Sequence, residues 1–496
     1  MMRKLFMFVL AGCLALFAVG VSAQTLTTGS LEGTITDVNG AAVPGVTITA
    51  TRQGGSPKTV TSNNEGRYTF PQLEPGKYKV TVEATKGFGK YEDSIDVSLG
   101  KTSDLTVQLA PAGASATVNV TAGSGATLDT TANTTGTNVS TEQFSNFPTQ
   151  RTVQSLYTIA PTVARSGLRD SSGRDRDPSV GGSSGPENNY ILDGVGVSDP
   201  AFGGSGGNLP FEFVQEIEIK TGAYGAEYGK STGGIFNVIT KSGTNDIRGD
   251  AFGYFTTKGL VRDVKTSAIP KTGSAPNGFS EIDAGFDIGG PIKKDKLYFF
   301  GAFNPQRRQN YFLTQTFLAN VNNKVTTPFY SGKITWQINQ NNVFNFSTFG
   351  DFTKQQGFLF GGSGFGANVN SFRGEIQTGG TNYAARLNST INPNWIGEFS
   401  AGLHFQRANT IPDSSVANTQ LITDNFAVLS GGGVLADVES STTASNGLRN
   451  AFVNGTGGSI QRNYIRQGFG LVSEQDRNRY EAAARLQNIW GKNTIK

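Results

Sequence analysis

The residues that could carry chemistry are few, and their spacing argues against an enzyme. Residues 225–231 read GAEYGKS and end like a phosphate-binding loop, but the first glycine of such a loop would fall at Tyr224. With one residue too few between the glycines, the backbone N–H groups cannot form the nest that holds phosphates. A turn between two strands is therefore favoured over a nucleotide site.

Metal chemistry has equally little support. The sequence holds one histidine, His404, and one cysteine, Cys13, so multi-histidine and multi-cysteine sites are excluded. His404 has no glutamate three residues later, which leaves no zinc-peptidase motif. Three aspartates in residues 170–177 are candidate calcium ligands, but three arginines among the residues around them neutralise that loop, and a solvated loop is favoured. We expect no catalytic residue, no metal and no cofactor.

The amino-acid composition also indicates which class of protein this is. Charged residues make up 16% of the chain, against roughly 25% in a typical soluble domain. Glycine occurs 65 times in 496 residues and phenylalanine 34 times. Such a profile is typical of all-β proteins and of outer-membrane barrels in particular. Removing Arg3 and Lys4 with the N-terminal segment lowers the formal net charge from +4 to +2, which offers nucleic acid no electrostatic footprint.

The N-terminus has the layout of a secretory signal peptide. Two cations in residues 1–4 precede an apolar run at 5–19, and small residues follow at 21–23. We predict cleavage between Ala23 and Gln24, which leaves a mature chain without cysteine. A membrane anchor and a lipidated Cys13 are the alternatives. No basic cluster follows Ala23, and the residues after Cys13 are apolar rather than a polar tether.

The elements that would position any site are almost all strands. Between residues 29 and 111, about seven short segments alternate or are rich in β-formers, with tight turns between them. We expect a small β-sandwich, in which Asn39-Gly40 makes a hairpin turn after the first strand. The expected strands are 31–36, 43–51, 66–70, 77–83, 94–98 and 102–109.

A linker and a small mixed unit follow the sandwich. Residues 112–137 are mainly Ala, Thr, Gly and Ser, a composition typical of a linker. Ser140 and Gln143 fit a capping box, which predicts a short helix that ends before Pro148. A second helical turn is expected at 152–159. Two strands at 213–220 and 234–240 are then joined by a turn rich in Gly and Tyr.

Beyond residue 248 the pattern changes to strands of about ten residues with two-residue alternation. In residues 395–406 one face carries Trp395, Phe399 and Leu403, and the other carries Glu398 and His404. Residues 281–289 and 330–338 alternate in the same way. Apolar-out, polar-in strands predict an outer-membrane barrel. A soluble sandwich also alternates, but the signal peptide, strand length and aromatic content favour the barrel.

Longer stretches resemble known families. Residues 37–46, 66–70 and 73–78 resemble the carboxypeptidase regulatory-like domain, which folds as a transthyretin-like sandwich and is similar to carbohydrate-binding modules. Residues 190–195, 199–200, 214–229 and 233–245 resemble the plug of TonB-dependent receptors. Residues 289–300 resemble the first barrel strands of the Oar-like subgroup. The resemblance implies a plug inside an outer-membrane barrel of 22 strands, opened by an inner-membrane energy-transducing complex.

These inferences predict an all-β-dominated chain in the outer membrane of a Gram-negative type of cell. The expected units are a signal peptide at 1–23, a carboxypeptidase regulatory-like β-sandwich at 27–111, a linker at 112–137, a small α/β plug at 138–245 and the N-terminal part of a transmembrane β-barrel at 246–496. The sandwich and plug are expected on the periplasmic side.

The last unit is expected to be part of a longer gene product. We identify about eight or nine strands there, whereas 22 strands at about ten residues each need roughly 220 residues before any loop is counted. Residues 474–490 are also compatible with an amphipathic helix, but a turn at Gly491 favours a strand, and Ile495-Lys496 would open the next one.

The predicted function is TonB-dependent, energy-coupled uptake of an unknown substrate, with oligosaccharides and peptides as candidates. The expected partners are the TonB complex, outer-membrane lipid and the substrate. Because a partner can add a strand to an extended segment, the resemblance suggests contact with TonB at Thr117, Val118, Asn119, Val120 and Thr121. An ordinary first plug strand is the alternative for this segment. The alternative function is a non-transporting adhesin or carbohydrate-binding surface protein, which would not need a plug.

Overall fold

The computed structural model covers three β-rich units and most of the chain between residues 27 and 495. The described residues are 27–85, 87–112, 134–145, 151–165, 177–225, 228–229, 231–261, 278–313, 320–358, 373–392, 394–412, 423–424, 427–428, 460–461, 464–465, 474–490 and 493–495. Among these residues, none of the helices has the length and apolar composition needed to cross a bilayer.

The N-terminal unit is a two-sheet sandwich, as the alternating pattern predicts. One sheet contains β1 (Gly29–Asp37), β4 (Arg67–Leu73), β7 (Thr102–Asp104) and β8 (Val107–Leu109). The other has the order β3 (Pro57–Thr61), β2 (Thr47–Arg52), β5 (Gly76–Val82) and β6 (Tyr91–Val97). Alternate residues of most of these strands turn inward and form one apolar core, which includes Leu31, Ile35 and Val80.

One expectation for the sandwich is confirmed and one is wrong in detail. The hairpin-type turn at Asn39-Gly40 forms, with Gly40 at φ +83° and an antiparallel bridge between Thr36 and Ala42 across it, but the returning chain does not continue directly into the next strand. β1 pairs with β4, β7 and β8, while β2 starts at Thr47, later than expected, and lies in the other sheet. The stretch around Pro44 instead carries the chain between the sheets, because proline has no N–H to donate to a ladder.

The second unit is a small mixed domain around a five-stranded sheet. The sheet order is β13 (Val195–Gly196), β12 (Asn189–Leu192), β15 (Ile235–Thr240), β14 (Val214–Gly222) and β9 (Thr135–Ser140). Its first strand takes in residues 135–137, which the sequence places in the linker. Short elements surround it: α2 (Thr141–Phe144), α3 (Val153–Tyr157), β10 (Val163–Ala164), β11 (Ser179–Val180), η1 (Gly185–Glu187) and η2 (Phe211–Phe213). The predicted capping box is present, with the Ser140 N–H donating to Gln143 Oε1 at 3.0 Å.

The third unit is a long antiparallel sheet. It runs in order through β16 (Arg248–Thr257), β17 (Gly278–Lys293), β18 (Leu297–Leu313), β19 (Asn320–Asn339), β20 (Asn342–Gly350), β22 (Arg373–Asn392), β23 (Trp395–Pro412), β28 (Asp476–Trp490) and β29 (Asn493–Ile495). β21 (Thr353–Phe358) continues β20 along β19 and β22. A short helix, η4 (Lys258–Leu260), follows β16, and four two-residue strands lie apart from the sheet: β24 (Thr423–Asp424), β25 (Ala427–Val428), β26 (Ile460–Gln461) and β27 (Tyr464–Ile465).

These strands confirm the predicted faces but are longer than predicted. Trp395, Phe399 and Leu403 on the outer face of β23 are 41%, 39% and 39% exposed, whereas Glu398 and His404 on the inner face are 2% and 1% exposed. β19 and β22 span 20 residues each rather than about ten. The extra length of β19 lies mainly at residues 320–329, which begin with the largely polar stretch 320–324. Residues 476–490 form a strand, as preferred over the helix.

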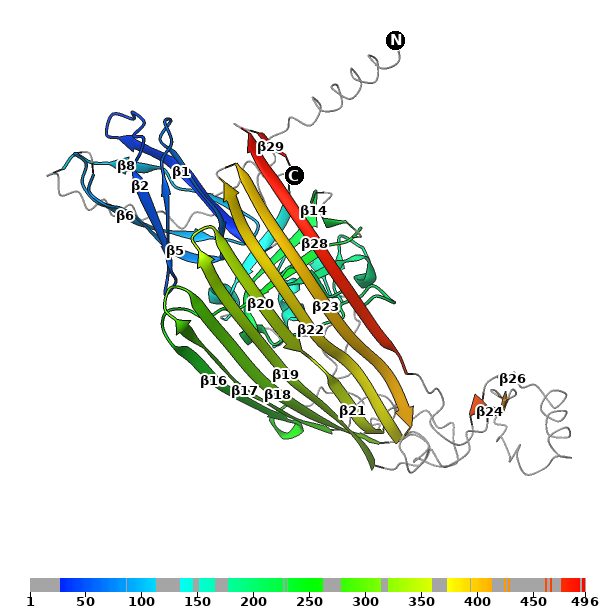
Figure 1. Cartoon of the computed structure of the whole chain (residues 1–496). Helices are drawn as coiled ribbons and strands as arrows, with labels where there is room; N and C mark the ends of the chain where they lie inside the picture. Colours follow the sequence, from blue (N-terminus) through cyan, green and yellow to red (C-terminus); the bar gives the residue numbers. More distant parts are fainter. Residues whose placement is uncertain are drawn as a thin grey trace, which may run out of the picture.

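The three units are stacked against one another (Figure 1). The mixed domain lies against the inner face of the sheet and shares an apolar cluster with it, in which Phe213 and Phe236 pack with Phe300 and Phe329 of the sheet. The sandwich lies beside one end of the strands, where short turns join β17 to β18 and β19 to β20 (Figure 1). Contacts among all three units meet at this end.

Candidate functional site: the junction of plug, barrel and sandwich

A left-handed turn in the mixed domain presents a buried carboxylate to the barrel wall. Asp193 and Gly194 connect β12 to β13 with φ values of +47° and +85°, a conformation that aspartate and glycine tolerate better than most residues. The turn directs Asp193 against the end of β15. Its Oδ1 accepts from the Thr240 N–H at 3.1 Å and its Oδ2 from Thr240 Oγ1 at 2.6 Å.

Two barrel cations complete this carboxylate's surroundings. Lys333 of β19 donates from Nζ to Asp193 Oδ1 at 2.9 Å and to the Thr240 carbonyl at 3.0 Å. Arg386 of β22 donates to the Asp193 carbonyl at 2.7 Å. The side chains of Lys333 and Asp193 are 4% and 5% exposed. Breaking such a desolvated pair on one side leaves a buried charge, which is strongly unfavourable.

Further ion pairs attach the mixed domain to β17. Arg151 lies 2.9 Å from Asp283 through its Nε, and Lys241 Nζ lies 3.1 Å from Asp287 Oδ2. The Arg151 guanidinium also stacks 3.5 Å from the centre of the Tyr254 ring on β16. Both aspartates belong to the polar face of β17, which the alternating pattern of residues 281–289 places inside the barrel. This face therefore binds the mixed domain through ion pairs.

A loop of the sandwich contacts the same domain. The Leu99 N–H donates to Glu216 Oε1 at 3.0 Å, and the Leu99 carbonyl accepts from Asn138 Nδ2 at 2.8 Å. Burial raises the pKa of Glu216 to about 7; the hydrogen bonds from Asn138 and Leu99 oppose that rise and the charge of Glu218 adds to it. Gly100, at φ +66°, lies so close to Glu218 that an added Cβ would be 2.2 Å from Oε1.

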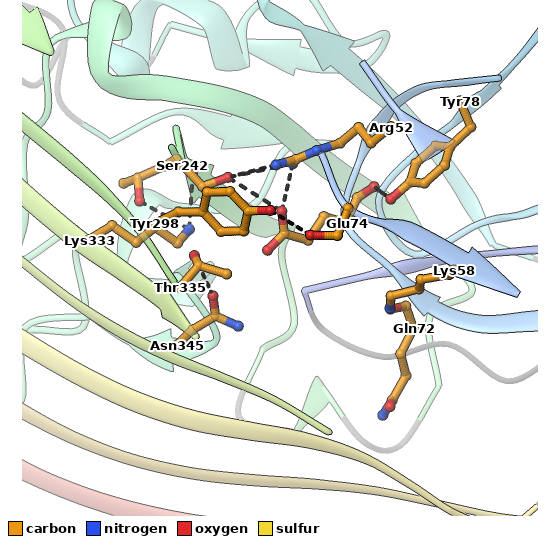
Figure 2. Close-up of polar contacts among 12 residues, drawn as sticks. Arg52, Lys58, Gln72, Glu74, Tyr78, Ser242, Tyr298, Lys333, Thr335 and Asn345 are labelled. Atoms are coloured by element: carbon orange, nitrogen blue, oxygen red, sulfur yellow. Dashed lines mark hydrogen bonds and ion pairs between the residues drawn. The ribbon is translucent and has the colours of Figure 1, made fainter. Parts of the chain in front are cut away.

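The sandwich also reaches the point where the mixed domain joins the barrel. Arg52 at the end of β2 and Glu74 in the β4–β5 turn form a 2.6 Å ion pair. Ser242, just beyond β15, lies 3.4 Å from Glu74 Oε2 and 3.4 Å from an Arg52 nitrogen. Figure 2 shows these side chains converging beside Tyr298, whose hydroxyl is 2.5 Å from Ser56 Oγ.

The electrostatics of this cluster join it to the Asp193 site. Burial alone would raise the pKa of Glu74, but Arg52, followed by Lys333, Lys58 and Arg386, outweighs burial and holds that pKa below its usual range. The barrel cations that hold Asp193 therefore also attract the sandwich. Burial lowers the pKa of Lys58 to about 8, although Glu74 opposes the change. A cavity of about 50 Å³, enough for a water molecule, is lined by Arg52, Lys58, Glu74 and Arg386.

The candidate residues taken from the sequence fall mostly elsewhere. The segment Thr117 to Thr121 and the cleavage site at Ala23 and Gln24 lie outside the described residues, as do Asp170 and Asp175. Within the described part of the chain, no three His, Cys, Asp or Glu residues gather as metal ligands. Asp177 accepts a 2.7 Å hydrogen bond from the Ser205 N–H.

Two other residues weighed in the sequence analysis, Tyr224 and His404, lie in a turn and on the inner face of a barrel strand. Tyr224 donates from its hydroxyl to the Gly233 carbonyl at 2.8 Å across the turn between β14 and β15. This contact belongs to an inter-strand turn, as predicted for residues 225–231. His404 is buried on the inner face of β23, where its Nε2 would be 2.9 Å from a Cβ added at Gly206.

Sequence reasoning did not single out the residues of the junction. Asp193 lies within the plug-like motif, and its neighbour Gly194 was the available signal for a strained turn. Lys333 lies on the polar face of an alternating strand, where a lone cation among small polar residues was a usable hint. Arg52 and Glu74 carry no local signal, since each becomes notable only through contacts with a distant part of the chain.

Comparison with known families identifies the three units. Residues 30–110 match the carboxypeptidase regulatory-like domain, residues 127–235 the TonB-dependent receptor plug domain, and residues 239–323 an outer membrane β-barrel domain. With a plug bound to the inner face of an outer-membrane barrel sheet, the chain has the domain architecture of TonB-dependent receptors. The soluble-sandwich alternative for the alternating strands is therefore wrong.

Individual relatives agree with this class. The chain is 33% identical over 300 residues to the TonB-dependent transporter Oar of Myxococcus xanthus. The matched region is 57% of this chain and 27% of Oar. It resembles the outer membrane transporter YddB from Escherichia coli with a TM-score of 0.52 and 16% identity, over 71% of this chain and 45% of YddB. The chain thus spans about a quarter of the length of the curated relative it matches.

Proposed function

We propose that the protein takes part in energy-coupled uptake of a substrate across the outer membrane. The buried pair of Asp193 and Lys333 is the observation that carries this proposal. A plug held to the barrel wall by a desolvated ion pair blocks passage until something displaces it. The outer membrane has no energy source of its own, so the force comes from an inner-membrane complex. No catalytic role is proposed for any residue.

Growth phenotypes test this function without knowledge of the substrate. A strain lacking the gene is compared with a strain lacking the energy-transducing complex on panels of carbon, peptide and iron sources. We expect a nutrient on which both strains grow poorly and on which the double deletion grows no worse than either. Normal growth of the gene deletion on every source, or additive defects in the double deletion, would contradict energy-coupled uptake.

We propose further that the partner binds at residues 117–121 by strand addition. The sequence TVNVT alternates and precedes the plug, so it can extend along a partner strand. Val118→Pro removes a donor from that ladder and is expected to abolish uptake, whereas Val118→Thr keeps the donor and a β-branched side chain and is expected to preserve it. Unchanged uptake by Val118→Pro would overturn this assignment.

We propose that the chain reaches this location after removal of residues 1–23. The basic, apolar and small-residue regions of the N-terminus support export and cleavage after Ala23. N-terminal sequencing of the protein from isolated outer membranes is expected to begin at Gln24. An intact Met1 or an acylated Cys13 would overturn this assignment.

A further inference from the structure

The sandwich lies at the periplasmic end of the barrel. Short turns join the strands at this end, whereas the connections at the other end are long, including residues 258–277 and 413–475. In outer-membrane barrels the short turns are periplasmic. The sandwich contacts three strand ends there: Ser56 with Tyr298 of β18, Thr59 with Gln340 of the β19–β20 turn at 3.3 Å, and Gln72 with the Gly397 carbonyl of β23 at 3.1 Å.

The sandwich covers the plug at the same end. The Leu99 loop rests on β14 and β9 through Glu216 and Asn138. The Asn245 N–H, between plug and barrel, donates to the Gly54 carbonyl at 2.5 Å. The sandwich therefore touches both the moving part of a plugged barrel and its fixed wall. A plug displaced toward the periplasm, or a substrate leaving in that direction, meets the sandwich.

The interface is of a kind that can open. The sandwich has its own apolar core, and none of the residues in that core belongs to the apolar cluster shared by plug and barrel. The contacts between the sandwich and the other two units include hydrogen bonds and charges, such as Arg52 and Glu74 around Ser242. Polar interfaces between domains with separate cores typically permit relative motion. Undocking would leave both cores intact.

We propose that the sandwich is a periplasmic gate, which closes the barrel exit when docked and swings away during transport. Its two holding points are the Arg52–Glu74 pair against Ser242 and the Leu99–Gly100 loop against β14. The inference rests on the proposed transport function, because a gate requires something to pass. Arg386, which donates to the Asp193 carbonyl, also lines the cavity beside Arg52 and Glu74, so the plug and the sandwich adjoin the same barrel cation.

The first experiment measures opening without any substrate. Ser242→Cys, part-buried against Arg52 and Glu74 of the sandwich, is labelled with a maleimide in living cells, with and without a protonophore. Asn39→Cys, in an exposed turn of the sandwich, is the matched control. Labelling of Ser242→Cys is expected to be faster in energised cells, while Asn39→Cys labels equally in both. Equal rates for Ser242→Cys in the two states would overturn the gate, whether or not uptake is detected.

The second experiment holds the gate shut. Thr59→Cys and Gln340→Cys, both exposed, are joined in cells by a bifunctional methanethiosulfonate, which a reductant later removes; Cys13 is the only natural cysteine. Uptake is expected to fall to the level of the gene deletion and to recover after reduction, while uptake by each single-cysteine variant is the same with and without the reagent. Full cross-linking with normal uptake would overturn the gate. A wild type without energy-dependent uptake would instead contradict the proposed function.

Discussion

Lys333 in the barrel wall and Asp193 in the plug form a buried ion pair, with 2.9 Å between Nζ and Oδ1. Thr240 satisfies the remaining carboxylate oxygen, and the Lys333 ammonium also donates to the Thr240 carbonyl. A buried pair adds little net stability compared with an apolar contact of the same shape, yet it is costly to break from one side. It therefore specifies one position of the plug, and leaving that position exposes two charges together.

Removal of one partner tests that relationship. Asp193→Ala leaves the Lys333 ammonium buried without its carboxylate, and we expect the plug to lose about 3–5 kcal/mol of stability. Hydrogen exchange of β12 and β15 in detergent-solubilised protein measures the loss. Asp246→Ala is the control, because its pair with Arg248 is 3.3 Å long and exposed, with an expected effect of about 0–1 kcal/mol. Similar losses in the two variants would contradict a specific role for Asp193.

Gly100→Ala tests the contact between the sandwich and the plug. A Cβ at Gly100 would lie 2.2 Å from Glu218 Oε1, and the backbone is at φ +66°. We expect overpacking of about 1–3 kcal/mol and loss of docking, seen as broader distances between spin labels at Thr59→Cys and Gln340→Cys. Gly40→Ala shares the left-handed strain at φ +83° but has nothing within 4 Å. Docking lost equally in both variants would assign the effect to backbone strain alone.

Docking is expected to depend on pH through Glu216. The pKa of this carboxyl is about 7 when the sandwich is docked, against an ordinary 4.5. Between these two pH values the docked state therefore binds a proton that an exposed Glu216 carboxylate would have lost. Docking is therefore strongest toward the acid side and weakens as the pH rises through about 7. The same spin-label distances, recorded from about pH 5 to about pH 8, should broaden with rising pH. Glu216→Gln should remove the dependence, and an unchanged profile in that variant would exclude Glu216 as its source.

The parts of the fold that the sequence predicts are those set by local patterns. Alternation in residues 395–406 predicts which side chains face lipid because a strand has a period of two. The capping box at Ser140 is equally local. β3 escapes prediction because Pro57 opens a five-residue strand with little hydrophobic signal, and the barrel strands appear short because their ends beyond the apolar band are polar.

The junction could not be predicted because it depends on the relative placement of whole units. Lys333 and Asp193 are 140 residues apart in the chain, and Glu74 and Ser242 are 168 apart. Neither pairing follows from the residues around it. Each requires the strand register of the barrel and the seat of the plug within it, and the Glu74 contact also requires the docked position of the sandwich.

Energy coupling is tested most directly by the initial rate of uptake of the nutrient found in the growth comparison, measured with and without a protonophore. We expect cells making the protein to take up the nutrient rapidly, and the protonophore to reduce the rate to that of the gene deletion. A rate that stays high after the proton-motive force has collapsed would mean that the barrel is open without energy, and would contradict a plug held by Asp193 and Lys333.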